Sequence, residues 1–307
     1  MKVLVVCSIN SGYIPPFSEE QVDALNSQGI ITDIFLIKQK GILGYLRERS
    51  GLLHKIKDFQ PDIIHAHYGL TGLFANLQRN VPVITTYIGS DINEKTLRKF
   101  SIISILLSKF NIFVSSKQVS LVKRFINGFE VIPFGVDYSI FHTIPKNVAR
   151  LKLGLSNDKK IILFSSKFDR PEKNALLAFE AMKLLPNVDL IELSGKNTRE
   201  EVVLLFNACD VGLLTSIREG SPQFIKELLA CNRPIVSTNV GDVEALIKGI
   251  DGCFIVPFEA KDVANAINLA FSYDSILVPV ETLKKNDNKM IAEQLIKVYK
   301  SVLVANI

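Results

Sequence analysis

The sequence lacks the residue patterns that hold metals or disulfide frameworks. Its four cysteines form no Cys-x-x-Cys pair, and no histidine stands at metal-ligand spacing from them. All four lie in apolar or nearly apolar surroundings, so we expect buried thiols. Asp-x-Asp is also absent, which removes the usual carboxylate pair for a metal-bound nucleotide. We therefore expect no metal site, and a bound diphosphate would have to be neutralised by protein cations.

Long apolar runs and a glycine-rich dinucleotide fingerprint are missing as well. No segment approaches the length needed to span a bilayer, and Lys2 followed by Val3–Val6 is too short for a signal peptide. These absences favour a cytoplasmic protein. Residues 2–28 show a strand–loop–helix pattern without Gly-x-Gly-x-x-Gly, so nicotinamide binding has no support.

The chain contains enough apolar residues to form two hydrophobic cores. It has 307 residues, of which 48% are hydrophobic, and this length suits two domains of ordinary size. Apolar strands alternate with amphipathic helices, which predicts an α/β protein with parallel, doubly wound sheets. A polar stretch after Val131–Asp137 marks the expected boundary. We predict domains at 1–145 and 146–286, followed by a C-terminal helix at 287–307.

The stretch 215–227 combines an anion site with two carboxylates. An apolar run before it predicts a buried strand, and Ser221 and Pro222 suit the N-cap and first position of the helix behind it. Glu219 would lie in the loop, and Glu227 about a turn and a half inside the helix. Free amides and the positive dipole end of a helix bind anions, while carboxylates accept hydrogen bonds from sugar hydroxyls. This combination suits a sugar joined to a nucleotide diphosphate.

Taken alone, the Glu-x7-Glu spacing is equally typical of a capped helix with two solvated acids. Here it accompanies Glu-Gly-Ser-Pro at 219–222, and Cys231–Ser237 and Val240–Glu244 follow it. This ensemble resembles the donor-binding region of retaining glycosyltransferases of family 4, which have the GT-B fold. The resemblance runs nearly end to end and is strongest at 161–257. It implies two Rossmann-like domains that face each other across a cleft.

The resemblance also implies individual roles on the donor side. Glu219 would contact the donor sugar and Glu227 the ribose, while Lys167 and Lys173 would carry the diphosphate; solvated loop lysines are the alternative. Retention of the anomeric configuration would follow from front-side attack, in which the leaving phosphate helps deprotonate the acceptor. The other donor-side residues expected are Gly220, Ser221, Pro222, Gln223, Gly195 and Gly12.

On the acceptor side we expect His67, Tyr68 and Asp91. His67 ends a predicted strand, and open α/β sheets bind ligands at the carboxyl ends of their strands; a structural histidine is the alternative. Asp91 belongs to a segment that in the family often reads His-Gly-Ser-Asp, and Ile88 replaces the histidine here. Asp91 either faces the acceptor or caps the next helix.

Basic residues gather in one part of the first domain. From Lys95 to Phe129 there are seven basic residues and no acidic one. This composition is compatible with docking of residues 95–124 on an anionic membrane surface or a phosphorylated lipid acceptor. An ordinary helix with a solvated basic side is the alternative.

The expected function is retaining, metal-independent transfer of a sugar from a nucleotide-diphosphate donor. The acceptor would be a glycan, a lipid-linked molecule or a polysaccharide precursor. The protein would be cytoplasmic or peripheral at the inner face of the plasma membrane. We expect no cofactor and no nucleic-acid partner. Two alternatives stay open: a nucleotide-sugar epimerase of the same fold, and a non-catalytic GT-B subunit that binds a partner transferase.

Overall fold

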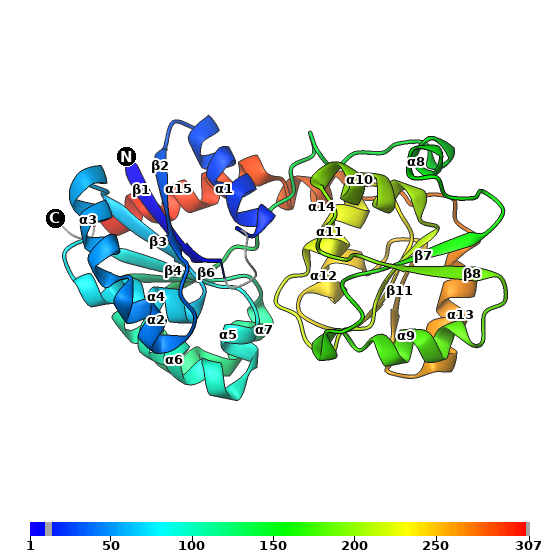
Figure 1. The fold of residues 1–307 in the computed structure, drawn as a ribbon, viewed down its shortest axis with the longest axis horizontal. Coiled ribbons are helices and arrows are strands. Elements are labelled where there is room, and N and C mark those ends of the chain that lie inside the picture. Colours follow the sequence, from blue (N-terminus) through cyan, green and yellow to red (C-terminus); the bar gives the residue numbers. More distant parts are fainter. Residues whose placement is uncertain (10–13, 305–307) are drawn as a thin grey trace. The chain divides into compact units, whose positions relative to one another are not determined.

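The computed structural model describes residues 1–9 and 14–304, which form two α/β units (Figure 1). The first unit comprises Met1–Gly135 and the chain from Asn288 onward, and the second comprises Val136–Asp287. All the strand pairings described are parallel, which confirms the predicted doubly wound class. Within the described ranges, each helix is too short or too polar to serve as a membrane span.

The first unit is built on a six-stranded sheet of order β2-β1-β3-β4-β5-β6. Its strands are β1 (Lys2–Ser8), β2 (Ile31–Ile37), β3 (Ile63–His67), β4 (Val83–Tyr87), β5 (Phe110–Phe113) and β6 (Phe129–Val131). Its helices are α1 (Pro16–Ser27), α2 (Gly41–Arg47), α3 (Arg49–Phe59), α4 (Gly69–Ala75), α5 (Ser90–Asn93), α6 (Lys95–Leu107), α7 (Ser116–Val122) and α15 (Asn288–Val304).

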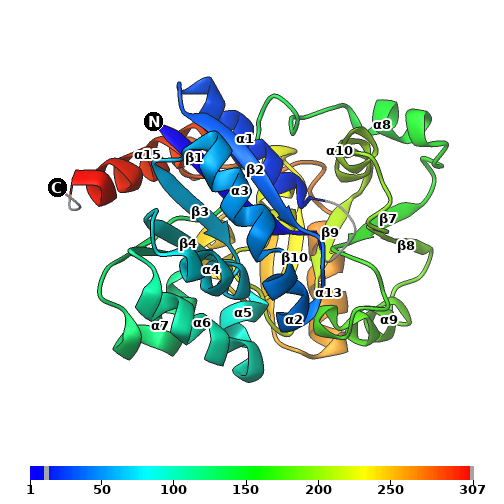
Figure 2. The same cartoon turned by 60° about the vertical axis from the view of Figure 1, so that its left-hand side comes forward.

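Helices cover both faces of this sheet, because successive side chains of each strand point to opposite sides. In β1, Val3 and Val5 belong to the cluster formed with α1 and α15, whereas Leu4 and Val6 pack with α2, α3 and α4. Helices α4 and α6 lie side by side (Figure 2). The continuous apolar run at the start of the chain therefore reflects burial on two faces.

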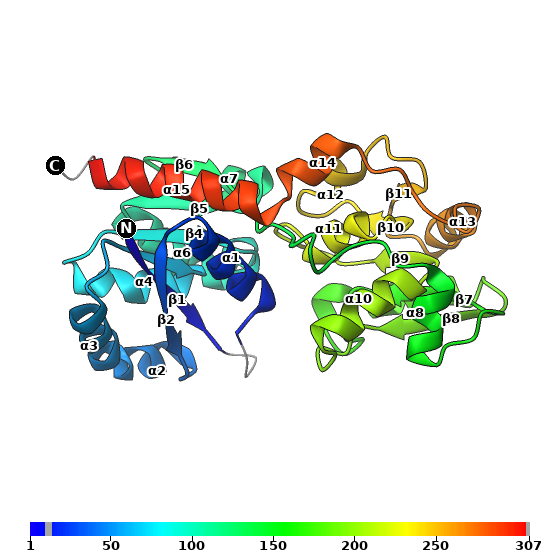
Figure 3. The ribbon, with the colours of Figure 1, turned by 90° about the horizontal axis from the view of Figure 1, so that it is seen from above.

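The last helix, α15, packs on the first unit although it follows the whole second unit in the chain. It lies against α1 (Figure 3). Leu295 and Val298 are buried in the same cluster as β1, and the hydroxyl of Tyr299 lies 2.6 Å from Nδ1 of His65 in β3. The helix thus completes the core of the first unit and also hydrogen-bonds to its central sheet.

The second unit has a five-stranded sheet of order β11-β10-β9-β7-β8. Its strands are β7 (Lys160–Phe164), β8 (Val188–Glu192), β9 (Val211–Leu214), β10 (Ile235–Thr238) and β11 (Cys253–Val256). Its helices are α8 (Lys146–Leu153), α9 (Ala175–Met182), α10 (Arg199–Ala208), α11 (Gln223–Ala230), α12 (Val243–Ile247), α13 (Ala260–Ala270) and α14 (Val280–Lys285). Ile161 and Leu163 of β7 face α10 and α11, and Ile162 and Phe164 face α9 and α13.

The chain enters the second unit at Val136, ahead of the boundary expected at residue 145. The physical reason is the packing of the intervening segment. Phe141 is 1% exposed and belongs to the core of the second unit, where its ring lies 5.8 Å from that of Phe206. The backbone amide of Val136 also donates to the carbonyl of Asn286 at 2.7 Å. The outgoing and returning segments of the chain are therefore hydrogen-bonded to each other.

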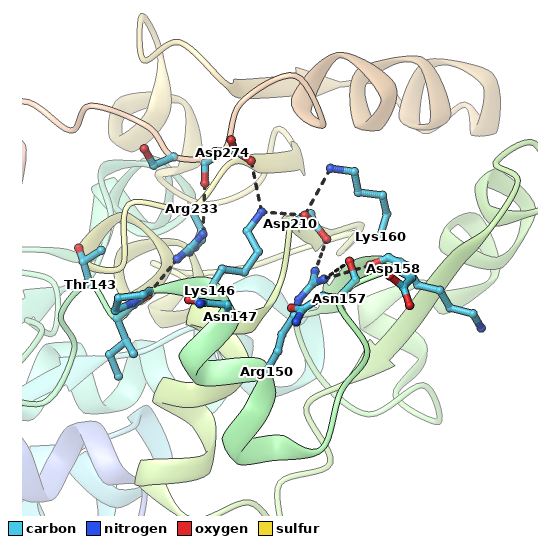
Figure 4. A pocket seen from close by; sticks show the side chains of 14 residues that line it. Thr143, Lys146, Asn147, Arg150, Asn157, Asp158, Lys160, Asp210, Arg233 and Asp274 are labelled. Atoms are coloured by element: carbon cyan, nitrogen blue, oxygen red, sulfur yellow. Dashed lines mark hydrogen bonds and ion pairs between the residues drawn. The ribbon is translucent and has the colours of Figure 1, made fainter.

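A pocket of about 740 Å³ lies at the amino ends of β7 and β9, around the buried carboxylate of Asp210 (Figure 4). Arg150 approaches one oxygen at 2.6 Å and Lys146 the other at 2.8 Å, with Lys160 at 3.5 Å. The backbone amide of Ile161 also donates to the carboxylate of Asp210, at 2.8 Å. Burial alone would raise the pKa of Asp210, but these contacts outweigh burial and hold it below its usual value. The charges lining this pocket therefore bind helix α8 to the sheet.

Removing this carboxylate should destabilise the second unit, because Arg150 would stay buried without its partner. We expect Asp210→Asn to lower the free energy of unfolding by about 3–5 kcal/mol in urea denaturation at pH 7. Lys160→Met is the control: Lys160 is 45% exposed, so its loss should cost less than about 1 kcal/mol. The difference in unfolding free energy between the wild type and Asp210→Asn should reach its full value above about pH 4. It should shrink as pH falls through the lowered pKa of Asp210. Equal losses in both variants would contradict this assignment.

Candidate functional site

Apart from Gly12, the residues expected on the donor side lie in loops at one edge of the second unit's sheet and in helix α11. Because its strands are parallel, the loops that follow β7, β8, β9 and β10 all leave from the carboxyl edge. The strand predicted at 211–214 is β9. The loop after β7 contains Lys167 and ends in a short turn at Pro171–Lys173, and the loop after β9 contains Glu219.

These loops are tied together by hydrogen bonds to backbone carbonyls. The hydroxyl of Thr215 donates to the carbonyls of Lys173 and Asn174, both at 2.9 Å. The hydroxyl of Thr238, at the end of β10, donates to the carbonyl of Ser216 at 2.7 Å. Neighbouring strands in the sheet thus fix the start of the loop that leads to Glu219.

Glu219 and Lys173 form an ion pair of 2.6 Å between Oε1 and Nζ. The hydroxyl of Ser216 donates to the same oxygen at 2.7 Å. Both charged side chains are mostly buried, with 13% and 16% of Lys173 and Glu219 exposed. Lys167 is half-buried and makes no ion pair with any residue that the structure describes. The structure therefore brings Glu219 and Lys173, which are 46 positions apart, into direct contact.

The helix after this loop begins later than predicted. Pro222 is the N-cap, with ψ of 116°, and Gln223 is the first helical residue. The prediction of Ser221 as N-cap is therefore wrong: the extended backbone at Pro222 moves the helix start by one residue. The buried hydroxyl of Ser221 has no hydrogen-bond partner within the described ranges.

Gly220 lies against the loop after β10. A side chain at Gly241, which has φ of +55°, would place its Cβ 2.3 Å from the carbonyl oxygen of Gly220. Both the left-handed backbone and this close approach require glycine. The Val240-Gly241-Asp242 segment thus packs directly against the backbone of the Glu-Gly-Ser-Pro loop.

Helix α11 carries two charged residues on its buried side. Glu227 is 6% exposed, and its Oε1 accepts from Arg199 at 3.0 Å. Burial raises the pKa of Glu227, and the charge of Arg199 opposes that shift. Lys226 is 1% exposed; burial lowers its pKa to about 8, while Asp242 and Glu227 oppose the shift. Arg199 and Lys226 were missed by the sequence analysis, although the capping box Thr198-x-x-Glu201 marks the helix start at which Arg199 lies.

Two of the expected glycines have different outcomes. Gly195 lies in the turn after β8 with φ of +71° and is exposed. The hydroxyl of Ser194, next to it, donates to the side chain of Asn197 at 2.9 Å. Gly12 lies outside the described residues. The structure thus places Gly195 at the same sheet edge as Glu219 and provides no position for Gly12.

In the first unit, His67 is part of a buried set of polar groups. Its Nδ1 lies 3.1 Å from the hydroxyl of Ser18, and burial lowers its pKa to about 4. Its Nε2 is buried without a hydrogen-bond partner in the described part of the chain. The neighbouring His65 contacts Tyr299 and, through Nε2 at 2.7 Å, Thr86. His67 is therefore a neutral imidazole near physiological pH.

Tyr68 and Asp91 lie at the carboxyl ends of β3 and β4. Tyr68 has φ of +87°, an unusual backbone conformation for a bulky residue, and its hydroxyl lies 3.0 Å from that of Ser90. The carboxylate of Asp91 is fully buried and accepts from the amides of Gly69, Ile88 and Gly89. Burial raises its pKa to about 6. Asp91 thus holds two loops together, and Tyr68 is the more accessible of the two.

No cluster of three or more His, Cys, Asp or Glu side chains suited to a metal occurs within residues 1–9 and 14–304. The four thiols are unpaired. Cys7, Cys209 and Cys231 are buried as expected, whereas Cys253 is partly exposed. Burial raises the pKa of each thiol, which makes all four unreactive.

Two family models match different parts of the chain. The model described as Glycosyltransferase Family 4 matches residues 3–139, and the one described as Glycosyl transferases group 1 matches residues 180–272. A putative teichuronic acid biosynthesis glycosyltransferase of Bacillus subtilis is 26% identical over 73% of this chain. A D-inositol 3-phosphate glycosyltransferase of Mycolicibacterium smegmatis is 23% identical over 71%. The aligned regions cover 65% and 62% of these relatives, so the chain spans slightly less than two thirds of their length.

Solved structures share the fold at low identity. Sucrose-phosphate synthase of Thermosynechococcus elongatus superposes with a TM-score of 0.83 at 16% identity, covering 99% of both chains. Anabaena HepE in complex with UDP and glucose gives a TM-score of 0.76 at 18% identity, covering 98% of this chain and 100% of its own. At these identities the likeness concerns the fold.

The close approach of two loops at Gly241 provides a test of the site's architecture. Gly241→Ala and Gly249→Ala both place alanine at positive φ, which should cost about 1–2 kcal/mol of stability. Nothing lies within 4 Å of a Cβ at Gly249, so it is the matched control. Gly241→Ala should cost a further 1–3 kcal/mol or so, because the backbone at Gly220 must move. Equal unfolding free energies of the two variants in urea would show that the close contact between Gly241 and Gly220 does not affect stability.

Proposed function

The chain belongs to glycosyltransferase family 4 and has the GT-B fold, and we propose that it transfers a sugar from a nucleotide-diphosphate donor. The observation that carries the proposal is the contact of Glu219 with Lys173 beside the start of helix α11. A carboxylate and an ammonium ion lie there together next to helix amides, and these groups match the sugar hydroxyls and the diphosphate of such a donor.

The donor-side roles follow from this arrangement. Lys173 and Lys167 would neutralise the diphosphate together with the amides at the start of α11. Glu219 would contact the hydroxyls of the transferring sugar, and Glu227 those of the ribose. A uridine nucleotide is the donor that we propose, because HepE, a protein of the same fold, is described in complex with UDP and glucose.

We further propose that transfer retains the anomeric configuration and needs no metal. The sequence has no Asp-x-Asp pair, so lysines would stabilise the leaving diphosphate, whose oxygen would help deprotonate the acceptor. Fixed charges in a water-excluded site are worth more than the same charges in water. The relative that is named for teichuronic acid biosynthesis supports a polysaccharide precursor as acceptor.

The different positions of Glu219 and Glu227 lead to different mutant phenotypes. Glu219→Gln should lower turnover by about 10²–10³-fold, because one charge that faces the transition state is lost, with affinity for UDP little changed. Glu227→Gln should weaken UDP binding by about 10-fold or more, because the ribose is present in donor and product alike. Turnover and calorimetric affinity for UDP should be measured for both variants.

Several outcomes would contradict the proposal. If Glu219→Gln weakened UDP binding and Glu227→Gln lowered only turnover, the roles assigned to Glu219 and Glu227 would have to be exchanged. Conversion of UDP-sugars into epimers without transfer would favour the epimerase. Absence of both transfer and slow hydrolysis by the pure protein, over a panel of UDP-sugars, would favour a non-catalytic subunit.

We also propose that the first unit docks on anionic lipid through helix α6. Its exposed residues Lys95, Lys99, Ile103 and Leu106 recur at helical spacing along one side. The two lysines precede two apolar side chains that are 46% and 61% exposed. Such a stripe suits a negatively charged membrane surface. Arg98 is not part of it, because it donates to the carbonyls of Ile92 and Asn93.

Vesicle binding tests this stripe. The double variant Lys95→Gln/Lys99→Gln should bind anionic vesicles about 30-fold more weakly, since each lysine near the surface contributes about 1 kcal/mol. Lys284→Gln/Lys285→Gln, which alters two exposed lysines of α14, is the control and should bind like the wild type. Equal sedimentation with neutral and anionic vesicles would make α6 an ordinary solvated helix.

A further inference from the structure

Arg199 is held between an aromatic ring and a buried carboxylate. Its guanidinium carbon lies 4.5 Å from the centre of the Phe141 ring, and its Nη2 donates to Oε1 of Glu227 at 3.0 Å. Phe141 is 1% exposed, so this ring is a fixed surface. A guanidinium group fixed on two sides can orient the carboxylate that it contacts.

The position of Arg199 in its helix is unfavourable for a cation. Arg199 is the first residue of α10, after the N-cap Thr198, where the helix dipole favours negative charge. Glu200 and Glu201 follow it in the first turn and fit that preference. Helix stability therefore does not account for an arginine at this position, whereas its contact with Glu227 does.

Glu227 depends on this contact for its charge. Burial raises the pKa of its carboxyl, and Arg199 is the leading influence that lowers it, followed by Lys226. Lys226 is less able to compensate, because burial brings its own pKa down to about 8. Burial raises the pKa of the nearby Cys231 thiol, and the charge of Glu227 adds to that shift.

We propose that Arg199 is a positioning residue that holds Glu227 as a charged acceptor for the ribose hydroxyls of the donor. The inference rests on the proposed function, in which Glu227 binds the ribose. Hydrogen bonds to an ionised acceptor are roughly twice as strong as those to a neutral one. A protonated Glu227 would also present a donor to one of the hydroxyls. Ribose binding should therefore follow the ionisation of Glu227, which burial opposes and Arg199 favours.

The experiment compares Arg199→Met with Arg199→Lys. Methionine keeps an unbranched side chain of similar length beside Phe141 and removes the charge, whereas lysine keeps the charge. Affinity for UDP is measured by calorimetry from pH 6 to pH 9. The affinity of each variant is expressed relative to that of the wild type at the same pH, because the phosphates of UDP ionise in this range too.

Arg199→Met should bind UDP about 10-fold more weakly or worse at the acid end, and the loss should shrink as pH rises through the increased pKa of Glu227. Arg199→Lys should follow the wild-type pH profile. Glu227→Gln should be weak at every pH, and combining it with Arg199→Met should remove the pH dependence. A constant loss across pH in Arg199→Met would mean that Arg199 has a structural role only.

A second measurement needs no nucleotide. The carboxyl carbon of Glu227 is titrated by NMR in the wild type and in Arg199→Met, and its midpoint should move to higher pH in the variant. An unchanged midpoint overturns the inference whatever UDP does. If the midpoint moves in Arg199→Met while the wild-type protein fails to bind UDP, that result would contradict the proposed donor and leave the inference about Arg199 standing.

Discussion

Charged side chains buried beside helix α11 are tolerated because each lies next to a group of opposite charge. An unpaired charge in this region would cost several kcal/mol. Glu219 contacts Lys173, and Glu227 contacts Arg199. The first pair joins two loops and the second joins helices α10 and α11, so the requirement for charge compensation also fixes the positions of segments that are far apart in the chain. The geometry of this edge of the sheet depends on that requirement more than on any single hydrogen bond.

The same pairing has consequences for the proposed chemistry. Lys173 and Ser216 both approach Oε1 of Glu219, so the groups that would contact sugar and phosphate are oriented by each other. Preorganised charges need little rearrangement when charge develops during a reaction. Arg199 and Glu227 form a second such pair just over one helical turn into α11, and the ring of Phe141 supports it.

The first unit buries two neutral histidines and a carboxylate, whereas the second unit pairs buried charges. His65 and His67 lie in β3 with ring centres 4.7 Å apart, and burial keeps the pKa of each below its usual value. Tyr299 brings a hydroxyl to His65 from α15. The polar groups behind the expected acceptor side are thus held partly by a helix from the end of the chain. Asp91 ties the neighbouring loops together through backbone amides.

The sequence by itself determined the alternation of strands and helices, the parallel sheets and the sheet edge at which most of the expected donor-side residues lie. Apolar runs such as those at β1 and β9 report burial directly, and parallel strands bring their carboxyl ends to one edge. Only the tertiary structure decided that Pro222 is the N-cap, that Asp91 accepts backbone amides, and that Arg199 contacts Glu227. Local periodicity shows which side of an element is buried. Which distant loops meet depends on packing and charge compensation across the whole unit, and no short stretch of sequence contains that information.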